Sequence, residues 1–307
     1  IASCLVGSEM CIRDRVYTVK EVREQVKAWR REGLTVGLVP TMGYLHEGHA
    51  SLIKKAVEQN DKVVVSVFLN PTQFGPTEDL EAYPRDFEAD CKLCESIGAA
   101  MVFHPEPSEM YAPDFCTWVD MDVLSKTLCG KSRPIHFRGV CTVVSKLFNI
   151  VTPDRAYFGQ KDAQQLAIIR RMVRDLNMDI EIVGCPIVRE EDGLAKSSRN
   201  TYLNEEERKA ALILSKAVFL GKKMVEDGET SAAAVKEAMI KKIESEPMAK
   251  IDYVEAVDGL SMQPVEEIKA PVLVAMAVYI GKTRLIDNFI VCLLYTSPSP
   301  RDKRQSR

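Results

Sequence analysis

The stretch Val39-Pro-Thr-Met-Gly-Tyr-Leu-His-Glu-Gly-His-Ala-Ser51 joins a predicted strand to a predicted helix. The apolar run at residues 34–39 is typical of a buried strand, and a proline and a glycine then interrupt it. From about Glu47 onward, apolar residues recur at the spacing of a helix. We therefore expect His46 and His49 at a strand-to-helix turn.

This turn has the features of a phosphate-binding site. A helix N-terminus carries unpaired N–H groups and partial positive charge, and imidazoles can donate hydrogen bonds to phosphate oxygens. The glycine spacing comes near a Walker P-loop, but His49 and Ala50 stand where that motif requires Lys and Ser or Thr. His46-x-x-His49 instead resembles the signature of adenylate-forming enzymes of the nucleotidyltransferase type. Taken alone, the pair also fits a helix start that binds no ligand.

Strands and helices alternate after this turn. Residues 63–69 are apolar throughout, which is typical of a strand buried on both faces of a parallel sheet. Further strands are expected at residues 101–103, 155–158 and 180–183, and helices at about 18–33, 84–98, 140–150 and from about 159 onward. This order predicts an α/β fold with a doubly wound parallel sheet. Because ligands gather outside the carboxyl ends of such strands, the turns that carry His46, Gln73 and Lys161 should converge.

A second, smaller α+β domain is predicted after residue 188. A helix capped at Asn204 and another from about Ser231 precede strand-like runs at 253–257, 272–280 and 284–290. We therefore place the sheet domain at residues 16–188 and the second domain at residues 189–291.

The two ends of the chain differ in character from the rest. Residues 1–15 have neither an apolar core suited to a signal peptide nor a Met at the start, and residues 292–307 run into Ser-Pro-Ser-Pro-Arg-Asp and a basic finish. Both resemble translated vector or adaptor sequence, and the fold prediction leaves them out. The alternative for the second tail is a basic segment that binds a polyanion.

The composition is typical of a soluble globular protein. Of 307 residues, 46% are hydrophobic and 28% are charged. The net charge of −3 does not indicate a protein that binds nucleic acid or an anionic membrane. No apolar run approaches the roughly 20 residues of a membrane span. Nine cysteines scattered through apparent core segments favour a cytoplasmic location over a disulfide framework. Cys91 and Cys94 fall inside a helical pattern, which favours packing over a metal or redox pair.

Five motifs occur in one order along the chain. They are residues 40–49, Phe68-Leu-Asn-Pro-Thr-Gln-Phe-Gly75, His136-Phe-Arg-Gly139, Phe158-Gly-Gln-Lys-Asp-Ala-Gln-Gln165 and Asp192-Gly-Leu-Ala-Lys-Ser-Ser-Arg-Asn200. From about residue 16 to residue 291 the chain resembles the pantothenate synthetase family. The resemblance implies a Rossmann-like, nucleotidyltransferase-type domain followed by a lid domain, in a cytoplasmic homodimer.

The same resemblance implies an activity. It implies ATP-dependent joining of pantoate and β-alanine through pantoyl adenylate, with release of AMP and pyrophosphate. It also implies Mg²⁺, held mainly by phosphate and water oxygens rather than by a protein ligand. Small-molecule substrates are the implied partners, without nucleic acid or membrane.

The resemblance further implies which residues form the site. The expected ATP contacts are Met42, Gly43, Tyr44, Leu45, His46, Glu47, Gly48, His49, Gly159, Gln160, Lys161, Asp162, Val188, Lys196, Ser197, Ser198 and Arg199. The expected catalytic residues among them are His46, His49, Lys161 and Arg199. Gln73 and Gln165 resemble the pantoate ligands, and Gln73 also lies at the β-alanine position. Tyr44 and Lys196 differ from the residues that are more common at these positions in the family, but neither difference removes a group that the chemistry needs.

Several assignments have alternatives. His49 is a proton donor or a phosphate stabiliser, and an ordinary pKa of about 6.5 leaves both roles open. Residues 197–199 alone suit a polar linking loop, and each glutamine alone suits a surface amide. His136 and Arg138 are expected to pack or to anchor a loop. The rival functions are a nucleotidyltransferase that moves AMP onto a phosphate ester and a nucleotide-binding module without turnover.

Overall fold

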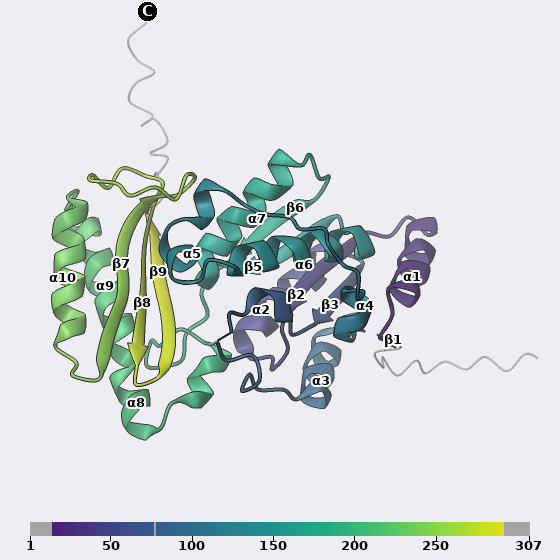
Figure 1. Ribbon diagram of the computed structural model, residues 1–307, viewed down its shortest axis with the longest axis horizontal. Coiled ribbons are helices and arrows are strands. Elements are labelled where there is room, and N and C mark those ends of the chain that lie inside the picture. The colour runs from purple at the N-terminus through teal and green to yellow at the C-terminus, as the bar shows by residue number, and fades with distance from the viewer. Residues whose placement is uncertain (1–13, 77, 292–307) are drawn as a thin grey trace, which may run out of the picture.

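Six parallel strands form the sheet of the N-terminal domain (Figure 1). The computed structural model describes residues 14–76 and 78–291. The strands are β1 (Asp14–Val16), β2 (Val36–Thr41), β3 (Lys62–Val67), β4 (Met101–Phe103), β5 (Arg155–Gly159) and β6 (Glu181–Cys185), in the order β1-β4-β3-β2-β5-β6. From β2 the chain winds through β3 and β4 toward one edge, and it then returns to place β5 and β6 on the other side of β2. The predicted doubly wound α/β sheet is confirmed.

Helices cover both faces of this sheet. They are α1 (Val19–Arg31), α2 (Glu47–Gln59), α3 (Phe87–Ile97), α4 (Pro107–Met110), α5 (Leu128–Ser132), α6 (His136–Val151) and α7 (Ala163–Asp175). Val63 and Val65 of β3 share a buried cluster with Ile53 of α2, whereas Val64 shares one with Leu147 of α6. Successive side chains of β3 are thus buried on opposite faces, which accounts for its continuous apolar sequence.

The C-terminal domain is a three-stranded antiparallel sheet with helices on its outer face (Figure 1). Its elements are α8 (Glu205–Ala210), α9 (Leu212–Glu226), α10 (Ala232–Glu244), β7 (Ala249–Asp258), β8 (Val272–Ile280) and β9 (Thr283–Val291). In β8, Val274 and Met276 belong to the core formed with α9 and α10. Leu273 and Ala275 belong instead to the core of the N-terminal domain. The central strand is therefore buried between its own helices and the other domain.

Some element boundaries differ from the prediction. Helix α3 follows its Asp86 cap rather than starting near residue 84, because the Asp86 side chain accepts a hydrogen bond from the first turn. Helix α6 begins earlier than expected, so residues 136–139 form its first turn. The helix expected from Asn204 is divided at Ala211 into α8 and α9.

Strand β1 begins inside the segment that the sequence analysis assigned to the N-terminal tail. Arg15 pairs with Val102 of β4, and its guanidinium lies 2.7 Å from the Glu88 carboxylate. The fold therefore starts at least two residues before the predicted boundary at residue 16, because a three-residue edge strand leaves no periodic signal. Residues 1–13 and 292–307 lie outside the described residues. Within the described part of the chain, no helix has the length and apolarity needed to cross a membrane.

Candidate active site

The centre of the large sheet is a switch point in its topology. Strands β2 and β5 are neighbours, and the chain leaves them toward opposite edges. In doubly wound folds, ligands bind in the crevice outside the carboxyl ends of the strands at such a point. A cavity of about 210 Å³ lies there. Met42, Asn70 and Val188 line it from the segments that follow β2, β3 and β6, and Gly159 lines it from the last position of β5.

Most of the predicted site residues line this cavity, which is called the smaller cavity below. They are Met42, His46, Gly48, His49, Gln73, Gly159, Lys161, Asp162, Gln165, Val188, Lys196, Ser197, Ser198 and Arg199. Gly43, Tyr44, Leu45, Glu47 and Gln160 are not part of the lining; each lies within a few residues of one that is. The turns that were expected to converge therefore do so.

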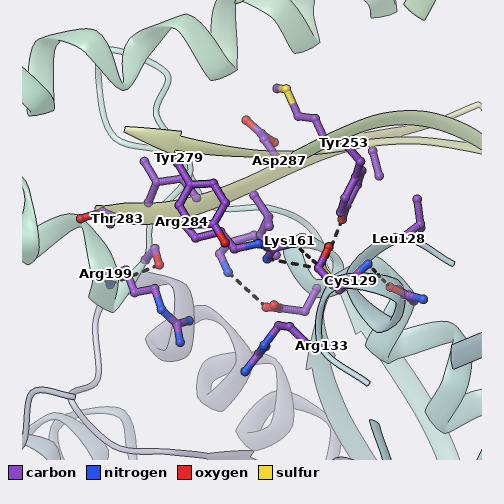
Figure 2. A pocket seen from close by; sticks show the side chains of 18 of the residues that line it. Leu128, Cys129, Arg133, Lys161, Arg199, Tyr253, Tyr279, Thr283, Arg284 and Asp287 are labelled. Atoms are coloured by element: carbon purple, nitrogen blue, oxygen red, sulfur yellow. Dashed lines mark hydrogen bonds and ion pairs between the residues drawn. The ribbon is translucent and has the colours of Figure 1, made fainter. Parts of the chain in front are cut away.

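A larger cavity of about 840 Å³ opens between the two domains (Figure 2). Arg133, Lys161 and Arg199 line both cavities. Tyr253 of β7 and Tyr279 of β8 line the larger one from the C-terminal sheet. The smaller cavity thus adjoins a wider chamber that the C-terminal domain completes.

His46 and His49 bond to the first turn of α2 through their ring nitrogens. His46 Nδ1 accepts a hydrogen bond from the Gly48 N–H at 3.1 Å, and His49 Nδ1 accepts one from the His46 N–H at 3.2 Å. This reciprocal pair is a capping box built from two histidines. Because each Nδ1 is an acceptor, the neutral ring carries its proton on Nε2. Each ring therefore has an Nε2–H group left to donate.

Both rings are neutral near pH 7. Burial, together with the nearby Lys161 charge, lowers the pKa of His46 to about 4. Burial, together with His46 and Lys161, lowers the pKa of His49 to about 3. The ordinary pKa assumed from the sequence does not hold in the folded chain. A neutral His49 ring can donate a hydrogen bond through its Nε2–H group.

Asp90 of α3 holds the turn before α2. Its carboxylate accepts the Tyr44 N–H at 2.9 Å and the Leu45 N–H at 2.6 Å. Gly43 has a φ of 85°, in the left-handed region that favours glycine. These contacts give the motif a structural role at positions that do not line the cavity. Asp90 was not predicted, because nothing local connects it to a turn 45 residues away.

The Gln73 side chain is buried and oriented by its neighbours. Asn70 Nδ2 donates to Gln73 Oε1 at 3.1 Å, and Gln73 Nε2 donates to Met42 Sδ at 3.0 Å. The Gln73 carbonyl accepts a hydrogen bond from His136 Nδ1 at 3.0 Å. Burial lowers the pKa of His136 to about 3, so this ring is neutral as well. His136 therefore anchors the Gln73 loop, in agreement with the role expected for it.

Other motif residues separate into lining and supporting positions. Gln165 lines both cavities, whereas its neighbour Gln164 lines only the larger one, where its buried amide donates to two main-chain carbonyls at 2.8 Å. The Arg138 guanidinium lies 4.8 Å from the centroid of the Trp118 ring and packs there, as expected. The two glutamines are adjacent in sequence, so only their tertiary surroundings distinguish them.

Each Lys or Arg that lines the smaller cavity has a carboxylate partner among the described residues. The pairs are Lys161 with Asp162 (Nζ–Oδ2 3.3 Å), Lys196 with Glu47 (Nζ–Oε2 3.0 Å), Arg199 with Asp79 (Nε–Oδ2 and Nη2–Oδ1, both 2.9 Å) and Arg133 with Glu78. Burial raises the pKa of Asp79, but the hydrogen bonds and charge of the Arg199 guanidinium lower it by more. The pKa of Asp79 therefore lies below its ordinary value. Arg133, Glu78 and Asp79 were not predicted. An anion that enters the cavity must share these cations with their carboxylates.

A family comparison decides how this site is interpreted. The family model described as Pantoate-beta-alanine ligase matches residues 14–290. The chain belongs to this ligase family. Pantothenate synthetase from Ruminiclostridium cellulolyticum is 67% identical over 274 residues, which cover 89% of this chain and 97% of that protein. The Enterococcus faecalis pantothenate synthetase is 63% identical over 272 residues, with coverage of 89% and 96%.

Solved structures of the same ligase family share both domains. Pantothenate synthetase from Thermus thermophilus matches with a TM-score of 0.86 and 45% identity, over 91% of this chain and 99% of that one. Pantoate-beta-alanine ligase from Francisella tularensis, solved in complex with Beta-gamma ATP and Beta-alanine, matches with a TM-score of 0.74 and 31% identity, over 90% and 97%. The family, the enzyme class and the fold expected from the sequence are thereby confirmed.

The described part of the chain was expected to contribute no protein ligand to Mg²⁺, and its acidic and histidine side chains bear on this expectation. Among the described residues, no group of three or more His, Cys, Asp or Glu side chains is placed to hold a metal ion. Asp162 lines the smaller cavity, and its carboxylate pairs with Lys161. Mg²⁺ in nucleotide sites usually keeps water and phosphate oxygens as ligands. The donor set therefore fits Mg²⁺ only as part of a metal–triphosphate complex.

Proposed function

We propose that this chain uses ATP to join pantoate and β-alanine into pantothenate through a pantoyl-adenylate intermediate. The observation that carries the proposal is the convergence of hydrogen-bond donors for phosphate (His46, His49, Lys161 and Arg199) with two amides (Gln73 and Gln165) around one cavity. Family membership supports the reaction class. The related Francisella ligase, solved with Beta-gamma ATP and Beta-alanine, supports the choice of two of the substrates.

In the first step, a pantoate carboxylate oxygen bonds to the α-phosphorus of ATP, and the bond from that phosphorus to pyrophosphate breaks. Negative charge moves onto the phosphate oxygens in the transition state, where preorganised donors lower the barrier. His46 and His49 supply Nε2–H groups, Lys161 supplies a point charge, and Arg199 supplies a planar fork. Bound Mg²⁺ would neutralise part of the triphosphate charge.

In the second step, the neutral amine nitrogen of β-alanine bonds to the acyl carbon, the bond from that carbon to the AMP oxygen breaks, and the nitrogen releases one proton to solvent. No protein nucleophile is needed, so the contribution of the chain is orientation and the exclusion of water. Gln73 and Gln165 hold pantoate, because amides pair with hydroxyl and carboxylate groups without adding charge. Gly159, Val188 and the 197–199 segment contact the nucleotide in this proposal. A cytoplasmic homodimer stays a prediction.

One assay tests the proposal against its rivals. We expect pyrophosphate release with ATP and pantoate alone, followed by pantothenate when β-alanine is added. Pyrophosphate release that requires a phosphate ester in place of pantoate would support the nucleotidyltransferase instead. ATP binding without release of pyrophosphate under any of these conditions would support the module without turnover.

Replacing His49 by Ala removes one donor to the transition state. We expect adenylate formation to fall by roughly 10²–10³-fold, the scale for losing a preorganised donor of this kind. Ser51→Ala on the same turn is the matched control, because its hydroxyl donates to the Gly48 carbonyl at 2.7 Å and does not line the cavity. Near-normal turnover of the His49 variant would remove this residue from the mechanism.

A further inference from the structure

Asn288 of β9 reaches across the domain contact to the main chain beside Lys161. Its Nδ2 group donates to the Gln160 carbonyl at 3.1 Å and to the Lys161 carbonyl at 2.9 Å. The residue is 3% exposed. Both carbonyls belong to the 3-10 turn Gln160–Asp162, which joins β5 to α7 at the switch point of the large sheet. A side chain of the C-terminal domain therefore fixes the backbone from which the Lys161 ammonium extends.

The amide of Asn288 uses only its donor end. Asn288 Oδ1 is buried and has no hydrogen-bond partner among the described residues. An unpaired buried acceptor is unfavourable, and an apolar residue of similar shape would avoid it. The polar side chain is therefore explained by the two bonds that Nδ2 makes rather than by packing.

Asp287 holds Asn288 in place. The Asp287 carboxylate is 1% exposed and receives both ends of the Arg189 guanidinium, at 2.7 and 2.8 Å. The same carboxylate accepts the Asn288 N–H at 2.8 Å. Because Arg189 directly follows the cavity residue Val188, these contacts tie β9 to two segments of the site. Figure 2 shows Asp287 on the strand above Lys161.

We infer that Asn288 is a positioning residue for Lys161, so that the C-terminal domain takes part in triphosphate binding through the main chain of residues 160–161. The inference rests on the proposed function, in which Lys161 binds phosphate. It assigns the C-terminal domain a role in the adenylation step, before β-alanine enters.

The test compares Asn288→Ala and Asn288→Asp with the wild-type chain in ATP–pyrophosphate exchange with pantoate. For Asn288→Ala we expect KM for ATP to rise about tenfold, because two hydrogen bonds that orient Lys161 are lost, while KM for pantoate stays within about twofold. Asn288→Asp keeps the shape but places an oxygen against two carbonyl oxygens. It should be at least as impaired as Asn288→Ala, whereas a packing role predicts the opposite ranking.

A double-mutant cycle separates positioning from general destabilisation. If Asn288 acts through Lys161, Asn288→Ala should have little further effect on KM for ATP in a Lys161→Ala background. Thr127→Val is the matched control, because it removes another bond across the domain contact, from Thr127 Oγ1 to the Met262 carbonyl at 2.9 Å. KM for ATP should be unchanged in this control. Each variant is assayed well below its own thermal midpoint, so that every comparison uses folded protein.

Two results would overturn the inference: an unchanged KM for ATP in Asn288→Ala, or full additivity with Lys161→Ala. Failure of the proposed function would look different. In that case the wild-type chain itself would show no pyrophosphate exchange that depends on both ATP and pantoate.

Discussion

Three histidines, of which His136 is buried and His46 and His49 are half-buried, each use one ring nitrogen in a hydrogen bond to the main chain. Nδ1 accepts an N–H in His46 and His49, whereas Nδ1 of His136 donates to a carbonyl. Burial disfavours protonation of each ring because the charged form loses its hydration, and at His46 and His49 a second proton would also disrupt the hydrogen bond that Nδ1 accepts. The donors proposed for phosphate are therefore oriented before any ligand arrives, which reduces the reorganisation needed in the transition state.

The neutrality of these rings predicts a pH-dependent stability. The pKa of His136 is about 3 in the folded chain and about 6.5 when unfolded, so the unfolded state binds the proton first as pH falls. The contribution of the neutral His136 ring to the free energy of unfolding is fully present above pH 6.5. It decreases as the pH falls from 6.5 toward the folded pKa of about 3. For this one histidine, the free energy of unfolding should fall by about 2 kcal/mol between pH 7 and pH 5. Urea unfolding at pH 7 and at pH 5 measures this change in the free energy of unfolding.

His136→Asn serves as the comparison for this measurement. It removes one titrating ring, so its free energy of unfolding should fall by about 2 kcal/mol less than that of the wild-type chain over the same interval. Equal pH dependence in the two proteins would show that the pKa of this ring is the same in the folded and unfolded states, which would contradict the prediction.

At the scale of elements, the contact between α6 and the Gln73 loop depends on Gly139. A Cβ at this position would lie 2.5 Å from the Thr72 carbonyl oxygen and 2.6 Å from the Gln73 nitrogen and Cα. These are main-chain atoms, which cannot yield as the end of a flexible side chain can. The glycine of the third motif thus lets a helix approach the loop that carries a proposed pantoate ligand.

Gly139→Ala should therefore displace the loop. Overpacking of this kind typically costs about 1–3 kcal/mol, and here we expect the strain to appear as a rise of about tenfold or more in KM for pantoate, with KM for ATP changed less. Arg138→Ala, on the same helix but exposed, is the control and should leave both constants unchanged. Steady-state kinetics with each substrate varied in turn will show the difference. An unchanged pantoate KM in Gly139→Ala would mean that the loop tolerates the methyl group.

At the scale of the molecule, the larger cavity lies between the C-terminal sheet and the N-terminal domain, beside the direct contact that Asn288 makes with residues 160–161 (Figure 2). We propose that the second domain, placed at residues 189–291, closes over the site when ATP and pantoate bind. We propose that this closure is a rotation of the second domain about the hydrogen bonds from Asn288 to the main chain of residues 160–161. Closure would exclude water from the acyl adenylate.

Small-angle X-ray scattering can measure this closure. The radius of gyration should decrease when ATP and pantoate are added together, because the two domains approach each other. AMP alone is the control for nucleotide binding without the second substrate. Superimposable profiles with and without both substrates would rule out the rotation.

The sequence alone sufficed for the parallel sheet, most of the helices and the turns that form the site. These features are local: a strand buried on both faces is apolar at every position, and a helix start has its own capping pattern. The motif resemblance then supplied the family. Edge strand β1 and the start of α3 were missed, because three residues or a single cap carry little periodic signal.

The tertiary structure alone decided which groups face one another. Arg199 pairs with Asp79 across 120 residues, Asp90 holds a turn 45 residues away, and Asn288 reaches a backbone 127 residues distant. The protonation state of His49 also follows from burial and neighbouring charge, which no spacing in the chain records. Periodicity reports which face of an element is buried. Electrostatics and hydrogen bonding depend on distances that exist only after the elements pack.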